Sequence, residues 1–69
     1  MELDCRGMRC PLPIIHLDKA VKDLIPEEQI LLRSDDPATE PDLRAWSRMT
    51  GHSFKKIADA EFLVTRGSA

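Results

Sequence analysis

Aromatic residues are scarce in this chain: its 69 residues include one Trp, two Phe and no Tyr. The core must therefore be built from Leu, Ile and Val, and the stacked aromatic platform of many single-stranded nucleic-acid modules is poorly supported. The formal net charge of −2 also argues against a general phosphate-backbone binder, because such a protein needs a basic face. We therefore expect no direct binding of nucleic acid.

Long apolar runs are missing as well. No stretch approaches the ~20 apolar residues that span a bilayer, and the opening Met-Glu-Leu-Asp lacks the basic and apolar segments of a signal peptide. We expect a cytoplasmic protein, because nothing in the sequence directs it elsewhere, and in the cytosol thiols stay reduced. Two cysteines in such a chain are more often reactive, metal-binding or buried than joined in a structural disulfide.

The length predicts a single domain over residues 1–69. A domain of this size buries only about 60% of the surface that its unfolded chain exposes. It can hold one modest core, and it has no room for a deep, self-contained substrate cleft.

Hydrophobic periodicity predicts alternating strands and helices. Strands are expected at residues 1–5, 29–34, 53–57 and 61–66, with Asp59 and Ala60 joining the last two. A helix should begin near Pro11, carry an apolar stripe and end at Pro26. The stripe consists of Ile14, Leu17, Val21 and Leu24.

A second helix is expected after residue 38. Thr39 and Asp42 resemble a capping box, in which Thr39 is the N-cap. Gly51 is placed to end the helix in the left-handed conformation. The side chains expected to face inward are Leu43, Trp46 and Met49.

The element order β-α-β-α-β-β predicts an α+β fold. A crossover through the first helix makes the first two strands parallel, and the closing hairpin makes the four-stranded sheet mixed. Two helices cover only one face of the sheet, so we expect a two-layer α/β sandwich with the other face in solvent.

Cys10 is the main candidate for a catalytic residue. Because it precedes Pro11, it avoids the α region and should lie at the N-cap or just outside it. The helix dipole and free N–H groups there favour a thiolate and lower the thiol pKa from ~8.5 toward ~3.5–7.5. Arg6 and Arg9 add positive charge, and Pro11 and Pro13 make the segment rigid. The same sulfur could instead be a small buried hydrophobe.

Cys5 should face inward on the first strand, in alternation with Leu3. The simpler interpretation is a buried, inert thiol. The alternative is a second thiol that pairs with Cys10 across the turn centred on Gly7, which requires Cα atoms within about 4.4–6.8 Å.

No metal site is expected. Cys5, Cys10, His16 and His52 show none of the ligand spacings of zinc sites. His16 should be a surface residue, and neither histidine is well placed as a general base for Cys10. Asp35 and Asp36 either bind a cation or a basic partner or form a solvated turn before the second helix. With Arg6, they are the candidate partner-binding residues.

Three segments together resemble the TusA-like (SirA-like) sulfur-carrier proteins. Residues 3–13 read Leu-Asp-Cys-Arg-Gly-Met-Arg-Cys-Pro-Leu-Pro, similar to the Cys-Pro-x-Pro hallmark of that family, which follows a short strand and a Gly-containing turn. Residues 35–38, Asp-Asp-Pro-Ala, resemble its second recurring segment, and Gly51-His52 its third. The order and spacing match over nearly the whole chain.

The resemblance implies a sulfurtransferase that acts as a persulfide carrier without a cofactor. Cys10 would accept sulfane sulfur from a donor such as a cysteine desulfurase or a rhodanese-type protein, and pass it to an acceptor protein. The pathway would be tRNA thiolation, sulfur supply to cofactors or sulfur oxidation. Gly7, Arg9, Pro11 and Pro13 would support the site, whereas Cys5 varies in the family.

Two other functions stay open at this point. One is a thiol-disulfide redox module that uses Cys5 and Cys10. The other is a non-catalytic regulatory domain that binds partners through the open sheet face around Leu31 and Arg33.

Overall fold

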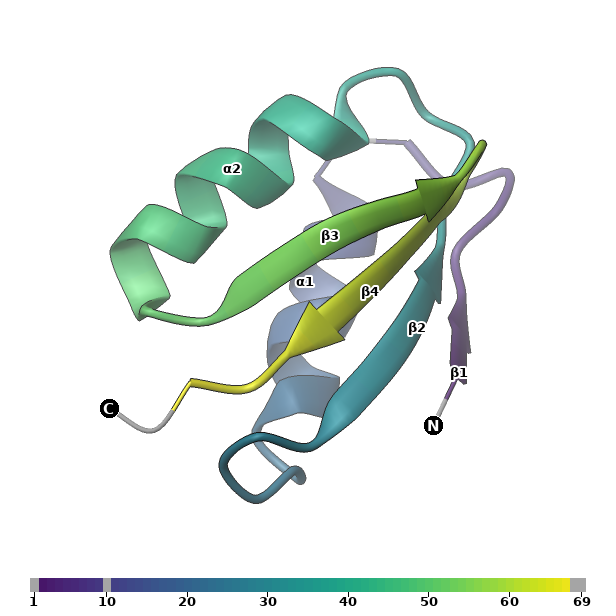
Figure 1. The fold of residues 1–69 in the computed structure, drawn as a ribbon. Helices are drawn as coiled ribbons and strands as arrows, with labels where there is room; N and C mark the ends of the chain where they lie inside the picture. The colour runs from purple at the N-terminus through teal and green to yellow at the C-terminus, as the bar shows by residue number, and fades with distance from the viewer. Residues whose placement is uncertain (1, 10, 68–69) are drawn as a thin grey trace.

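The computed structural model describes residues 2–9 and 11–67. Its elements are β1 (Glu2–Asp4), α1 (Leu12–Val21), β2 (Gln29–Arg33), α2 (Thr39–Thr50), β3 (Ser53–Ala58) and β4 (Glu61–Thr65). Both helices lie on the same side of a four-stranded sheet (Figure 1). The predicted α+β two-layer sandwich is therefore confirmed. Within the described residues, neither helix is long and apolar enough to cross a membrane.

The strands lie in the order β1-β2-β4-β3. β1 and β2 run parallel, and β4 is antiparallel to both of its neighbours, so the sheet is mixed as predicted. Leu3 pairs with Leu32, which pairs in turn with Phe62. One row of inward side chains thus crosses three strands.

The core is mainly aliphatic, as the shortage of aromatic residues predicts. Its buried members among the described residues are Cys5, Leu17, Val21, Leu24, Ile30, Leu32, Leu43, Trp46, Phe62 and Val64. Each fully buried Leu, Ile or Val side chain contributes roughly 1.5–3 kcal/mol. The core lies between the helices and the sheet, and it leaves both loops at the carboxyl ends of β1 and β2 at the surface.

The expectation that the first helix continues to Pro26 is wrong, because α1 ends at Val21 with Lys22 as its C-cap. The Arg66 guanidinium, which follows β4, donates hydrogen bonds to the carbonyls of Val21 (3.2 Å), Lys22 (3.3 Å) and Leu24. The last carbonyls of a helix need such donors, so a tertiary contact stabilises this end. Leu24 still reaches the core through a tight turn, in which its N–H donates to the Val21 carbonyl (3.0 Å).

The predicted capping box at the start of α2 is also wrong. The N-cap is Ala38, with no capping side chain among the described residues. Thr39 is buried, and its hydroxyl shares a hydrogen bond with the Ser34 hydroxyl at 2.6 Å. A buried hydroxyl needs such a partner, so the Thr39 hydroxyl bonds to Ser34. The Asp42 N–H, which a capping box would use, donates to the Ala38 carbonyl. The Asp36 carboxylate accepts the Ala38 N–H at 3.0 Å.

The other end of α2 is partly as predicted. Gly51 is the C-cap at φ 81°, in the left-handed region, and Leu43 and Trp46 are buried. Met49 is 85% exposed, so its predicted inward position is wrong. Leu43, Trp46 and Met49 are spaced three residues apart, which is less than one helical turn of 3.6 residues. Successive side chains therefore rotate around the helix, and Met49 no longer faces the core.

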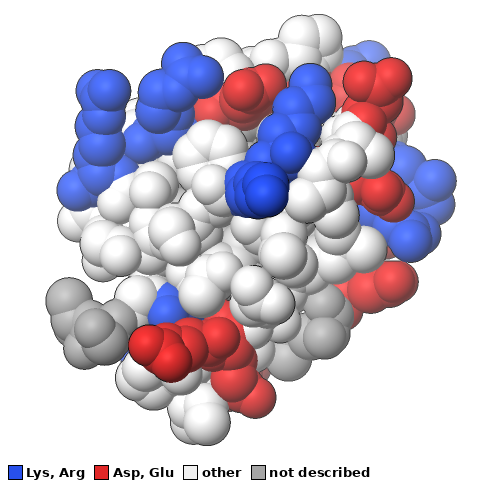
Figure 2. Space-filling view, in the orientation of Figure 1, with Lys and Arg blue, Asp and Glu red and all other residues white. Residues whose placement is uncertain are grey.

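The open face of the sheet carries Leu31 and Arg33, which point away from the core as predicted and are partly buried. Leu31 pairs with Leu63, and Arg33 makes ion pairs with Glu2 (3.5 Å) and Glu61 (3.4 Å). Figure 2 shows this face: uncharged residues occupy much of its middle, one Lys or Arg side chain reaches into it, and other charged side chains lie around it.

Candidate functional site

The loop from β1 to α1 is held at its start by the backbone. The Cys5 N–H donates to the Arg33 carbonyl (2.7 Å), which continues the pairing of β1 with β2. The Met8 N–H donates to the Cys5 carbonyl (3.1 Å), and Gly7 adopts φ 84°. The predicted turn centred on Gly7 is therefore confirmed, and glycine adopts its positive φ without the steric cost of a side chain.

The start of α1 is open at the surface. Pro11 is the N-cap, and its carbonyl accepts the Ile15 N–H at 3.0 Å. Arg9 and Pro11 are exposed, whereas Pro13 is buried and anchors the first turn in the core. This turn contains no acidic residue, and no described side chain caps it. The helix end therefore keeps its positive partial charge toward solvent.

Cys10, the predicted catalytic residue, lies outside the described residues. Its sequence neighbours Arg9 and Pro11 are both exposed. The chain enters α1 one residue after Cys10, at the Pro11 N-cap. The prediction that Cys10 carries the chemistry stays a prediction.

Cys5 is a free thiol with 0% exposure, as expected from its alternation with Leu3. Burial raises the pKa of the Cys5 thiol, and the negative charge of Asp4 raises it further. A thiol that is buried and kept protonated reacts slowly.

Arg6 is engaged within the loop. Its guanidinium donates to both carboxylate oxygens of Asp4, from Nε at 3.0 Å and from Nη2 at 2.8 Å. The Arg6 backbone N–H adds a third hydrogen bond at 3.1 Å. These hydrogen bonds lower the pKa of the Asp4 carboxyl from 3.8 to about 2. The predicted contact of Arg6 with a partner protein stays a prediction.

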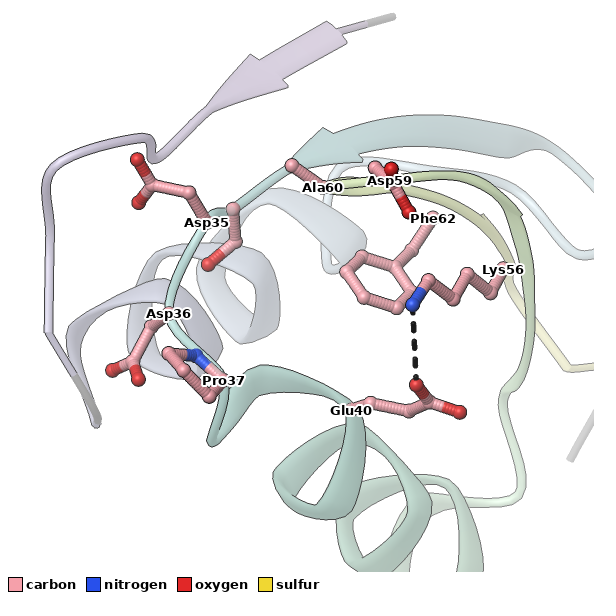
Figure 3. Close-up of a pocket in the computed structure, with 9 residues that line it drawn as sticks. Asp35, Asp36, Pro37, Glu40, Lys56, Asp59, Ala60 and Phe62 are labelled. Atoms are coloured by element: carbon pink, nitrogen blue, oxygen red, sulfur yellow. Dashed lines mark ion pairs between the residues drawn. The ribbon is translucent and has the colours of Figure 1, made fainter.

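The two aspartates that follow β2 have different neighbours. Asp35 is exposed and accepts the Gly7 N–H at 3.0 Å across 28 sequence positions, while Asp36 accepts the Ala38 N–H. They also line a hollow of about 320 Å³, which is shown in Figure 3. An ion pair between Lys56 and Glu40 (3.7 Å) crosses it.

A second concave region runs between the two helices beside Pro11. Two adjoining hollows, of about 340 and 310 Å³, share Pro11, Ile14 and Trp46. Their other lining residues include Lys19 on α1, Lys22 just after α1 and Met49 on α2. We call this region the interhelix groove. It is mostly apolar, and it begins at the residue that follows Cys10.

The histidines lie apart from the loop. His16 is exposed on α1, as predicted. His52 accepts the Gly67 N–H on Nδ1 (2.9 Å), and its ring stacks obliquely on Trp46 at 5.1 Å. The described residues contain no group of three His, Cys, Asp or Glu side chains that could hold a metal ion.

Two features of the site have no simple sequence signal. The bond from Gly7 to Asp35 joins residues 28 positions apart. The interhelix groove combines side chains of both helices, and it includes Met49, whose spacing predicted a core residue. Pairwise contacts of this kind depend on how the elements pack, which periodicity does not specify.

The fold and this junction define a class: a small two-layer α+β domain in which a Gly turn leads to an exposed helix start within the Cys-Pro-x-Pro segment, where no described side chain caps the helix. The family model described as "Sulfurtransferase TusA" matches residues 1–66. The chain belongs to the TusA sulfurtransferase family, as the sequence resemblance predicted.

Two curated proteins of Bacillus subtilis (strain 168) are similar to the chain. "Putative sulfur carrier protein YrkF" is 38% identical over 52 residues, which cover 75% of this chain and 28% of YrkF. "Putative sulfur carrier protein YrkI" is 33% identical over 57 residues, which cover 83% of this chain and 76% of YrkI. The chain thus spans little more than a quarter of YrkF and about three quarters of YrkI.

Proposed function

We propose that this chain is a sulfur carrier that holds a sulfane sulfur as a persulfide on Cys10. Family membership and the names of both relatives support transfer of sulfur in general. The observation that carries the specific proposal is the exposed start of α1, which has no acidic residue in its first turn. A thiolate or persulfide anion beside this end is stabilised by the helix dipole and by the charge of Arg9.

The transfer consists of two thiol exchanges that need no external oxidant. The Cys10 thiolate attacks the outer sulfur of a donor persulfide, the donor S–S bond breaks, and the donor leaves as a thiolate. Cys10 then carries –S–SH. An acceptor thiolate attacks that outer sulfur, and the Cys10 thiolate is released.

The donor in this proposal is a cysteine desulfurase or a rhodanese-type protein, and the acceptor is a second protein in a cytoplasmic relay. The relay serves tRNA thiolation, sulfur supply to cofactors or sulfur oxidation. Because a domain of this size has little room for a deep cleft, the partners provide the rest of each active site. The interhelix groove begins at Pro11, the residue after Cys10 in the sequence, and it is an apolar surface that a partner could cover.

A Cys5–Cys10 redox pair is less well supported. The Cys5 side chain is fully buried, and burial raises its pKa. A disulfide would require this side chain to leave the core and to react as a thiolate. The Cys5 geometry therefore favours a packing role.

The experiment measures the intact mass of the protein after incubation with a cysteine desulfurase and cysteine, and separately with sodium tetrasulfide. We expect a gain of one sulfur atom that a reducing thiol removes. Cys10→Ser should abolish the gain, and Cys5→Ser should keep it. No gain with either donor, or a gain that survives in Cys10→Ser, would contradict the proposal. Equal loss in both variants would point to the redox pair.

A further inference from the structure

The hydrogen bond from Gly7 to Asp35 connects the loop that leads to Cys10 with the loop after β2. The Gly7 N–H donates to Asp35 Oδ1 at 3.0 Å. In Figure 3 the Asp35 carboxylate points toward the loop after β1 and away from Phe62 in the hollow. The acceptor is charged, and hydrogen bonds to carboxylates are shorter and stronger than neutral ones.

The backbone of Asp35 is held from both sides, which limits where its carboxylate can lie. On one side the Ser34 N–H donates to the Ala60 carbonyl (2.9 Å), and the buried Ser34 hydroxyl bonds to Thr39. On the other side the Asp36 carbonyl accepts the Thr39 N–H at 2.9 Å. The backbone of Asp35 therefore has little freedom to follow a moving loop.

Within the described residues, the loop is held by its first residue and its turn, and Met8 also packs partly buried against the core. Cys5 is fixed by burial and by its bond to Arg33, and Met8 closes the turn on Cys5. Gly7 has no side chain that could anchor it, and it is exposed. Cys10 follows Gly7 by three residues, a chain length of at most about 11 Å. Over this short length of chain we expect a shift at Gly7 to affect Cys10.

We propose that Asp35 is a positioning residue for sulfur transfer, which acts on Cys10 by holding the Gly7 N–H of the loop that leads to it. This inference rests on the proposed function. It differs from the expectation that Asp35 binds a partner, because here the Asp35 carboxylate acts as a hydrogen-bond acceptor within the chain.

Two substitutions separate the acceptor from the charge. Asp35→Asn removes the charge and keeps an oxygen acceptor, whereas Asp35→Ala removes both. Asp23→Ala is the matched control, because Asp23 is an exposed aspartate in the turn after α1. All variants are prepared as the full chain and compared with wild type in thermal unfolding.

The first measurement tests the contact itself by NMR. The Gly7 amide proton should exchange with solvent faster in Asp35→Ala, and it should stay protected in Asp35→Asn and Asp23→Ala. An unchanged Gly7 amide in Asp35→Ala would overturn the inference.

The second measurement follows Cys10 in two reactions with small reagents, alkylation by iodoacetamide across pH and sulfur loading from sodium tetrasulfide. Both reagents react with the thiolate, so below the thiol pKa we expect a loss on the order of tenfold in Asp35→Ala, the change in thiolate fraction for a shift of about one pKa unit, with recovery in Asp35→Asn. The alkylation profile of Asp35→Ala should move to higher pH than that of Asp35→Asn. Loss of charge alone would move both profiles equally.

The outcomes separate the two proposals. If Asp35→Ala reacts like wild type, or if Asp35→Asn is as slow as Asp35→Ala, the positioning role is wrong. If both variants load tetrasulfide normally but fail only with a protein donor, Asp35 acts on the partner, and the inference is also wrong. If wild type takes up no sulfur while Asp35→Ala still slows alkylation, the proposed function fails and the positioning role stands.

Discussion

At the residue scale, the two cysteines are separated by their surroundings. Cys5 lies at 0% exposure in the core, where burial and the charge of Asp4 raise its thiol pKa. The described neighbours of Cys10 are exposed and belong to a helix start without acidic residues. Asp4, at the end of β1, forms an ion pair with Arg6 in the loop that follows. The Cys5 sulfur thus packs in the core, whereas Cys10 directly precedes the helix start in the sequence.

The Asp4–Arg6 pair predicts a pH dependence of the loop. The pKa of Asp4 is lowered from 3.8 to about 2, first by the side-chain hydrogen bond from Arg6 and then by its backbone N–H. The pair therefore stabilises the loop fully above pH 3.8, and this contribution is lost as the pH falls through about 2.

An NMR titration of the Asp4 carboxyl carbon measures this shift. We expect a midpoint near 2 in wild type and a midpoint closer to 3.8 in Arg6→Ala. A wild-type midpoint near 3.8 would show that the pair does not form in solution.

At the element scale, Asp18 connects the two helices. Its Oδ1 accepts the Trp46 indole N–H at 3.1 Å, and its Oδ2 lies 3.8 Å from Lys22 Nζ. The i, i+4 spacing accounts for the pair with Lys22 but not for the contact with α2. Since Trp46 is only 7% exposed, its indole N–H has little access to water and depends on Asp18.

Asp18→Ala should therefore destabilise the protein by about 1–3 kcal/mol, the cost of a buried donor without a partner. Asp18→Asn keeps an acceptor and should recover most of this loss. Lys22→Ala removes only an exposed ion pair, worth roughly 0.3–0.5 kcal/mol. Urea unfolding followed by Trp46 fluorescence gives all three values. Equal losses in Asp18→Ala and Lys22→Ala would show that the indole contact contributes nothing.

At the scale of the whole molecule, two of the exposed apolar side chains, Met49 and Ile57, lie on separate surfaces. Met49, 85% exposed, borders the interhelix groove beside Pro11, and Ile57, 49% exposed, lies on β3 at the irregularity between Lys56 and Ala58. Only the first surface adjoins the segment that carries Cys10. If partners cover the interhelix groove, the two positions should differ in their effect on transfer.

Met49→Asp and Ile57→Asp form a matched pair for this test. Met49→Asp should slow sulfur transfer with a protein donor by about tenfold, which corresponds to about 1.4 kcal/mol of partner affinity. Loading from tetrasulfide should be unchanged, because that reagent needs no docking surface. Ile57→Asp should leave both rates unchanged. An equal effect of the two substitutions would argue against the interhelix groove as the docking surface.

The sequence predicted the order of the six elements, the faces of β2, the turns at Gly7 and Gly51, and the inward side chain of Cys5. The TusA family assignment also followed from three short segments read in order. Each of these rests on residues a few positions apart, where periodicity and turn chemistry act directly. The role of Cys10 is still a prediction from that resemblance and from its place before Pro11.

Only the tertiary structure decided where the first helix ends, which partner Thr39 takes and which way Met49 points. Arg66 reaches the carboxyl end of α1 from beyond β4, and Ser34 draws Thr39 away from a capping role. The bond from Gly7 to Asp35 likewise forms because the carboxyl ends of β1 and β2 meet at one edge of the sheet. Local sequence patterns determine whether a segment forms a helix, a strand or a turn, and tertiary packing determines which polar groups come close enough to form hydrogen bonds.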